Sequence, residues 1–246
     1  MRTHGYTTIV LTALLLTGAN ALETMLSKTK LQEIQKNSIT LNKPTITLKE
    51  GIDKESVYFL KLETKTKKGS RVLKAFVDKK TGAVYMGQGY DKEGKILSFP
   101  KNIPLIKEGI SFSYGNGKKD IYIVTDPECP YCIKFEKASQ GKLDAYRVHV
   151  IVYPLPYHKK APAMMEWILQ GKDDAQKHKR LKAVMVDNSQ EYKTLIIDEK
   201  KPFIAVESTQ RAIERSKKAM NELEVRGTPA VFDANFSSIS WGSLVR

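Results

Sequence analysis

The spacing of apolar and polar residues divides the chain into an N-terminal part rich in short strands and a C-terminal part where strands and helices alternate. Apolar positions from Glu23 to Asn37 recur at helical spacing and predict an amphipathic helix. Residues 94–110 include Pro100 and Pro104, which disfavour a long helix, so this stretch is predicted to be a linker. Between the helix and the linker four short segments are predicted strands, and they are 45–48, 57–64, 72–77 and 83–86.

The second half of the chain begins with a strand, a helix and a second strand. The apolar run 121–124 is followed by a predicted helix from Pro130 to about Gln140 and a predicted strand over 147–153. Such a βαβ unit implies a parallel sheet. A mostly helical stretch, interrupted near 187–201, continues to a last helix over 208–223. We expect Gly227 to stop that helix and residues 228–232 to return to the sheet.

The N-terminus has the pattern of an export signal. Arg2 precedes an apolar run from Ile9 to Leu16, and the small residues Ala19 and Ala21 follow it. The run is too short to span a bilayer, and the pattern predicts a signal peptide over 1–21, cleaved after Ala21. A buried helix is the less favoured alternative. Export would place the chain in a compartment where disulfides persist.

The chain is strongly basic, with a formal net charge of +14. The basic residues between Lys159 and Lys182 are mixed with Glu166, Asp173 and Asp174, and aromatic residues do not alternate with them as in a nucleic-acid stacking surface. We therefore interpret them as a solvated face and expect no nucleic-acid partner. Contact with anionic membrane surfaces or acidic clients stays open.

Cys129 and Cys132 are the only cysteines, and they lie two residues apart directly after the first apolar run. A structural disulfide closing so short a loop would restrict the unfolded chain by only about 2 kcal/mol, against nearly 5 for a loop of about a hundred residues. Zinc needs four ligands, and His149, His158 and His178 are scattered singly. A redox-active thiol pair is therefore the favoured interpretation.

The residues around the pair indicate why it would react. Residues 126–128 predict a turn, and Pro130 suits the first position of a helix, so Cys129 is predicted to be the N-cap. Its sulfur would then face the free N–H groups of Tyr131 and Cys132, which would stabilise a thiolate. Cys132 would resolve a mixed disulfide. Glu128 opposes the thiolate, and we expect its side chain to turn to solvent.

Four segments resemble the bacterial periplasmic protein disulfide isomerases of the DsbC/DsbG type. Val124–Cys132 resembles the active-site segment, Gly227–Val231 the cis-proline segment, Leu155–Tyr157 the lead-in to a helical insertion, and Gly89–Asp91 the end of an N-terminal domain. The resemblance implies an α+β N-terminal dimerisation domain over 22–93. After the linker it implies an α/β thioredoxin-like catalytic domain over 111–246, with a helical insertion over about 159–223.

The resemblance also implies roles for particular residues. The cysteine pair would be catalytic, and the two residues between the cysteines would tune the redox potential. Thr228 and Pro229 would form a cis peptide bond beside the cysteines that receives an extended client segment. No cofactor beyond the pair and no metal are implied. The implied partners are exported client proteins, a membrane thiol-disulfide reductase or oxidase, and a second copy of the chain. The residues concerned are Cys129, Cys132, Pro130, Tyr131, Thr228 and Pro229.

These expectations favour a periplasmic disulfide isomerase or reductase. An oxidase that introduces disulfides and a chaperone that holds unfolded clients are the alternatives, and Thr228 resembles the isomerase side. A cytosolic glutaredoxin shares the Cys-Pro-Tyr-Cys motif but not the signal or the N-terminal domain. The chain ends at Arg246, soon after the cis-proline hairpin, so we do not predict the closing helix of the thioredoxin fold. Either the insertion covers that face of the sheet, or the chain is truncated.

Overall fold

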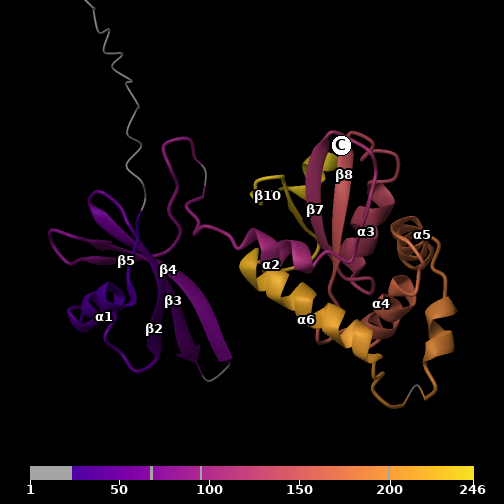
Figure 1. The fold of residues 1–246 in the computed structure, drawn as a ribbon, viewed down its shortest axis with the longest axis horizontal. Helices are drawn as coiled ribbons and strands as arrows, with labels where there is room; N and C mark the ends of the chain where they lie inside the picture. Colours follow the sequence, from indigo (N-terminus) through magenta and orange to yellow (C-terminus); the bar gives the residue numbers. More distant parts are fainter. Residues whose placement is uncertain (1–23, 67–68, 95, 199) are drawn as a thin grey trace, which may run out of the picture. The chain divides into compact units, whose positions relative to one another are not determined.

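The computed structural model describes residues 24–66, 69–94, 96–198 and 200–246, and the predicted signal peptide lies outside them. The chain divides into two compact units, with the boundary between Phe99 and Pro100. Each unit contains its own five-stranded sheet and its own buried core (Figure 1). The predicted combination of an α+β unit followed by an α/β unit is confirmed.

Unit 1 is an antiparallel sheet in the order β1-β2-β3-β4-β5. All four segments predicted as strands lie in or overlap β2 to β5. Asp78 closes the last hairpin by accepting hydrogen bonds from the N–H groups of Lys80 and Thr81, and Gly82 follows with a positive φ of 71°. The strands are β1 (Thr24–Met25), β2 (Ile46–Asp53), β3 (Val57–Thr66), β4 (Gly69–Asp78) and β5 (Val84–Met86).

One helix, α1 (Lys28–Lys36), covers a face of this sheet and buries Leu31 and Ile34. The prediction that the helix starts near Glu23 is wrong. Ser27 is the N-cap and accepts a hydrogen bond from the Lys30 N–H at 3.2 Å, and the residues before it pair with β2 as strand β1. The helix begins later because a serine at the cap satisfies a free N–H group of the first turn.

The predicted linker contains a short helix, α2 (Ile103–Glu108). Asn102 caps it by accepting a hydrogen bond from the Leu105 N–H at 3.1 Å, and Pro104 occupies the first turn. A proline is tolerated there because its missing N–H would have had no partner within the helix. Ile106 of this helix is fully buried in the core of unit 2.

Unit 2 has a mixed sheet in the order β10-β9-β7-β8-β6. Strands β7 and β8 are parallel and joined by helix α3 (Pro130–Ala138), so the predicted βαβ unit is confirmed. The other three pairings are antiparallel. The strands are β6 (Phe112–Tyr114), β7 (Lys119–Thr125), β8 (Tyr146–Val152), β9 (Ala230–Phe232) and β10 (Ser238–Ile239).

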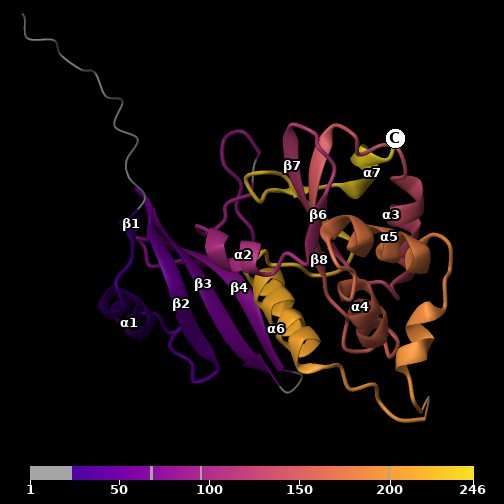
Figure 2. The same cartoon turned by 45° about the vertical axis from the view of Figure 1, so that its right-hand side comes forward.

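Helices cover both faces of this second sheet (Figures 1 and 2). Ile121 and Ile123 of β7 pack with α3, α4 and α5 on one face, whereas Tyr122 and Val124 pack with α2 and α6 on the other. This alternation follows from the two-residue period of a strand. The remaining helices are α4 (Ala161–Leu169), α5 (Asp174–Met185), a 3₁₀ helix (Glu191–Leu195), α6 (Glu207–Glu222) and α7 (Trp241–Leu244).

Two expectations about helix ends are corrected. Helix α6 stops before Gly227, because Glu224 takes a positive φ of 55° and the Val225 N–H bonds to the Met220 carbonyl at 3.0 Å. This closing pattern caps a helix without needing a glycine beyond it. In addition, a short helix, α7, does follow the β9–β10 hairpin, and its Trp241 packs edge-on against Phe135 of α3 with ring centroids 5.9 Å apart.

Candidate active site

The cysteine pair lies where β7 ends and α3 begins. Cys129 is the N-cap of α3, with φ −72° and ψ 123°, and Pro130 is the first helical residue, as predicted. The Cys129 N–H donates to the Asp126 carbonyl at 3.1 Å, which closes the turn before the helix. Both cysteines are free thiols in the structure.

The Cys129 sulfur does not behave as predicted in this dithiol state. The N–H groups of Tyr131 and Cys132, both within the described part of the chain, form no cap hydrogen bond with it. Instead the thiol donates to the Thr228 carbonyl oxygen, with Sγ 3.6 Å from that oxygen. Cys129 is 6% exposed, so a narrow part of the residue reaches the surface.

Cys132 is fully buried, and burial raises its pKa to about 12. Its sulfur accepts a hydrogen bond from the Asp126 N–H at 3.4 Å. The Thr228 hydroxyl acts against this rise in the Cys132 pKa. That hydroxyl has no hydrogen-bond partner of acceptable geometry among the described residues, however, so we consider burial the dominant effect. Cys132 therefore keeps its proton at neutral pH, and of the two cysteines only Cys129 has any exposed surface.

The Thr228–Pro229 peptide bond is cis, as the resemblance implied. It immediately precedes β9, in which Ala230 pairs with Val124 at the end of β7. This pairing brings the Thr228 carbonyl to the Cys129 sulfur, although the two residues are 99 positions apart. The two predicted site segments therefore meet in one place.

Pro130 and Tyr131 lie on the outside of the first turn of α3. Tyr131 is 67% exposed. Tyr157 is also largely exposed and packs edge-on against His158, with ring centroids 4.6 Å apart. One exposed tyrosine, Tyr131, therefore lies between the cysteines, and the other, Tyr157, lies in the segment whose His158 contacts Asp126 before Cys129.

A buried carboxylate, which the sequence reasoning did not single out, organises the turn before Cys129. The Asp126 side chain is fully buried and accepts hydrogen bonds from the Glu128 N–H at 2.7 Å and the Leu155 N–H at 2.6 Å. His158 Nδ1 lies 2.9 Å from the same carboxylate. The aspartate followed two residues later by its N–H partner is a recognisable local turn signal, but the other two partners are visible only in the fold.

The expectation that Glu128 turns to solvent is wrong. Its carboxylate accepts hydrogen bonds from the N–H groups of Lys160 at 2.7 Å and Ala161 at 2.9 Å, where α4 begins. The carboxylate lies at the partly positive N-terminal end of that helix, where a negative charge is stabilised. Glu128 is therefore held in a defined position one residue before Cys129.

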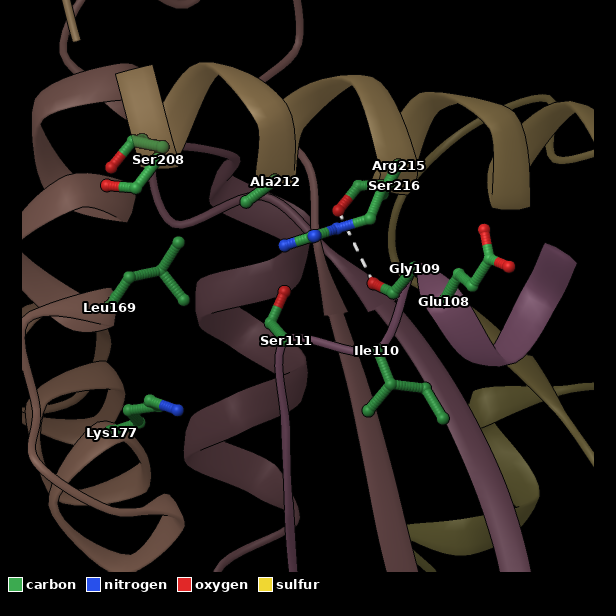
Figure 3. Close-up of a pocket in the computed structure, with 11 residues that line it drawn as sticks. Glu108, Gly109, Ile110, Ser111, Leu169, Lys177, Ser208, Ala212, Arg215 and Ser216 are labelled. Atoms are coloured by element: carbon green, nitrogen blue, oxygen red, sulfur yellow. Dashed lines mark hydrogen bonds between the residues drawn. The ribbon is translucent and has the colours of Figure 1, made fainter. Parts of the chain in front are cut away.

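A separate pocket of about 220 Å³ lies in the same unit between α6, the end of α4 and the loop before β6. In Figure 3 the Ser216 hydroxyl donates to the Gly109 carbonyl across one side of the pocket, and the Arg215 side chain crosses above Ser111. Neither cysteine lines it. This pocket is therefore not part of the cysteine site.

Over the residues that the structure describes, no three His, Cys, Asp or Glu side chains gather as a metal ion would require. In that same part of the chain, none of the helices is long and apolar enough to cross a membrane.

Comparisons with solved structures gave distant likenesses. DsbG of Helicobacter pylori is 16% identical with a TM-score of 0.40, over 82% of this chain and 98% of that one. A periplasmic thioredoxin-like protein of Salmonella enterica is 16% identical with a TM-score of 0.45, over 60% and 94%. ScsC of Proteus mirabilis in a transitional conformation is 16% identical with a TM-score of 0.41, over 54% and 68%.

The family assignment depends on the sequence model and not on these likenesses. A search of curated proteins found no match. The model of the thioredoxin-like domain matches residues 108–235, which is just over half of the chain and contains both cysteines and the cis-proline. Within that span lie four of the five strands of the unit 2 sheet, the exception being β10. The chain therefore belongs to the thioredoxin-like family.

Proposed function

We propose that this protein is a thiol:disulfide interchange enzyme that acts as a disulfide isomerase or reductase on exported proteins. The observation that carries the proposal is the asymmetry of the pair. Both cysteines are buried, but Cys129 keeps 6% of its surface exposed and bonds to the Thr228 carbonyl, whereas Cys132 is fully buried with its pKa raised to about 12.

The proposed reaction begins at Cys129. Its thiolate attacks one sulfur of a client disulfide, a bond forms between Cys129 and that sulfur, and the client disulfide breaks. The released client thiolate takes up a proton or attacks another disulfide of the same client. In the second case the client thiolate freed by that attack then attacks the client sulfur bound to Cys129, which forms a new client disulfide and releases Cys129 as a thiolate. In the first case Cys132 loses its proton, attacks Cys129, releases the client thiol and leaves a Cys129–Cys132 disulfide.

The buried state of Cys132 supports isomerisation as one outcome. Cys132 must lose its proton before it attacks, and burial makes that loss unfavourable at neutral pH. A slow second step would give the client time to rearrange while it is bound to Cys129. The chemistry resides in the two sulfurs, so the proposal needs no cofactor.

The setting of this activity is also part of the proposal. We infer a periplasmic location from the signal pattern over 1–21, and exported client proteins follow from that location. A membrane thiol-disulfide reductase would keep an isomerase reduced, and unit 1 would hold two copies together as a homodimer. Size-exclusion mass tests the homodimer, and the cysteine redox state in intact cells tests whether a reductase keeps the pair reduced.

The decisive experiment uses a client with several scrambled disulfides. We expect the reduced protein to restore native pairing, Cys129→Ser to abolish the reaction, and Cys132→Ser to accumulate mixed disulfides with the client. Rapid oxidation of a reduced client without reshuffling would establish an oxidase instead. Protection of unfolded clients that persists in both serine variants, with no disulfide exchange, would establish a holding chaperone.

A further inference from the structure

The two carboxylates that precede Cys129 both bind the short segment 155–161, which leads into the helical insertion. Asp126 binds Leu155 and His158 of this segment, as described above. Glu128 binds the N–H groups of Lys160 and Ala161. The turn that presents Cys129 and the start of α4 are therefore held together by side chains from the turn.

Glu128 acts as the missing cap of α4. Lys160 is the N-cap by position, yet its side chain gives no cap hydrogen bond within the described residues, and Pro162 in the first turn has no N–H to satisfy. Glu128 supplies the acceptor for the first two N–H groups of the helix. Its charge therefore lies at the partly positive end of α4 and not free in solvent.

The position of Cys129 matters to the balance between dithiol and disulfide. The hydrogen bond from the Cys129 thiol to the Thr228 carbonyl needs the thiol proton, so it exists only in the dithiol. A turn that is fixed in place keeps that bond available. A turn that moves freely would weaken the bond and so favour the disulfide.

We propose that Glu128 is a positioning residue whose carboxylate ties the Cys129 turn to the first turn of α4 and thereby shifts the pair toward its dithiol form. This inference rests on the proposed thiol:disulfide function. Glu128 has two effects of opposite sign. Its hydrogen bonds to α4 favour the dithiol while the Cys129 thiol keeps its proton, whereas its negative charge favours the disulfide only at a pH high enough for the Cys129 thiolate to form.

Two conservative variants separate these effects. Glu128→Gln keeps an oxygen that can accept both hydrogen bonds but removes the charge. Glu128→Asp keeps the charge but shortens the reach to Lys160 and Ala161. The matched control is Glu166→Asp, because Glu166 accepts the Val206 N–H at 2.7 Å where α6 begins and so makes the same kind of cap elsewhere in the insertion.

The measurement is the equilibrium of the full chain with glutathione, in which one protein dithiol and one oxidised glutathione give one protein disulfide and two reduced glutathiones. Amide hydrogen exchange at Lys160, Ala161 and Val206 reports each cap in the same samples. At a pH where the Cys129 thiol is protonated, we expect Glu128→Asp to shift the equilibrium about 3-fold or more toward the disulfide and Glu128→Gln to leave it unchanged. At a higher pH, where the thiolate forms, Glu128→Gln should shift it about 3-fold toward the dithiol. Glu166→Asp should speed exchange at Val206 and leave the equilibrium within about 1.5-fold of wild type.

Three results would overturn the proposal. One is an unchanged equilibrium in a variant whose Lys160 and Ala161 amides exchange faster. Another is an equal shift in Glu166→Asp, which would make the effect general to the insertion. The third is unchanged amide exchange at Lys160 and Ala161 in Glu128→Asp and also in Glu128→Ala, a further variant that removes the carboxylate. That result would mean that Glu128 does not cap α4. If the wild-type pair itself does not equilibrate with glutathione, the proposed function fails instead.

Discussion

The two sheets of this protein have the same number of strands but are buried differently. In β4 of unit 1 the covered residues alternate with others, and Val72 and Leu73 remain exposed. In β7 of unit 2 every residue from Ile121 to Thr125 is buried. The first pattern is typical of an antiparallel sheet covered mainly on one face, and the second of a central strand covered on both.

This difference shows why the cysteine chemistry belongs to unit 2. A strand buried on both faces ends in a dry environment, and Cys132 near the end of β7 has its pKa raised because it is buried there. Unit 1 contains no cysteine and no histidine among residues 24–99. The comparison predicts that exchange activity and the stability of the two sheets can be changed separately.

The largest effect is expected at the nucleophile. Cys129→Ser should lower the rate of thiol-disulfide exchange by at least about 1,000-fold, because serine cannot form the thiolate that attacks. Amide exchange in both sheets should stay close to the wild type, because Cys129 is buried but serine has nearly the same size and shape as cysteine. An assay with a small aromatic disulfide as substrate measures the rate. A residual rate above a tenth of the wild-type rate would show that Cys129 is not the attacking sulfur.

A matched pair of core truncations should separate the sheets. Leu60 in β3 and Ile123 in β7 are 0% and 3% exposed, so replacing either by alanine should lower the free energy of unfolding of its own unit by about 2–5 kcal/mol. Only Ile123→Ala should also slow disulfide exchange, because Ile123 packs in the core cluster that contains the cysteines. Denaturant unfolding followed by amide exchange assigns each loss to a unit. Equal slowing by Leu60→Ala would contradict the comparison.

A smaller effect is expected in the layer of α2 and α6, which only the sheet of unit 2 has. A Cβ atom added at Gly109 would lie 2.4 Å from the Ala219 Cβ, so Gly109→Ala should destabilise unit 2 by about 1–3 kcal/mol through overpacking. Gly227→Ala is the control, because nothing lies within 4 Å of its added Cβ and it should change stability by less than about 0.5 kcal/mol. Similar losses in both variants, measured by thermal unfolding, would refute a specific contact.

The smallest effect concerns pH. His178 stacks on Tyr114 with ring centroids 3.6 Å apart, and burial, with Lys182 nearby, lowers its pKa from 6.5 to about 4. As pH falls, the unfolded chain therefore takes up a proton at His178 before the folded chain does. The full stability of unit 2 is present above pH 6.5, and part of it is lost as pH falls toward 4. We expect unit 2 to lose about 1–2 kcal/mol over that window, less than the full shift implies because solvent reaches part of the ring. His178→Gln should flatten the loss, and an unchanged pH profile would exclude His178 as its source.

Interactions between neighbours in the chain were predictable from the sequence. The βαβ unit followed from an apolar run, a proline at the first helical position and a second apolar run. Cys129 as the N-cap of α3 followed from Pro130. Each of these features depends on residues a few positions apart, which any window of the sequence contains.

Where two local signals competed, the elements begin or end at other residues than the sequence predicts. The first helix was predicted to begin near Glu23, but it begins after Ser27, whose side chain caps its first turn. The last long helix was predicted to stop at Gly227, but it stops earlier because Glu224 takes the left-handed conformation. The short helix at Trp241 was not predicted, since its packing partner Phe135 lies in α3. Packing against distant elements decides such ends.

The residue pattern alone places two thiols at the start of a helix after a buried strand. The partners that the neighbouring groups bind depend on the three-dimensional fold. The Cys129 thiol bonds to a carbonyl 99 residues away, and Glu128 bonds to an N–H group 33 residues away. A charged or polar group takes whichever partner the fold brings nearest, and the fold brought a carbonyl and a helix start in place of a local cap and solvent.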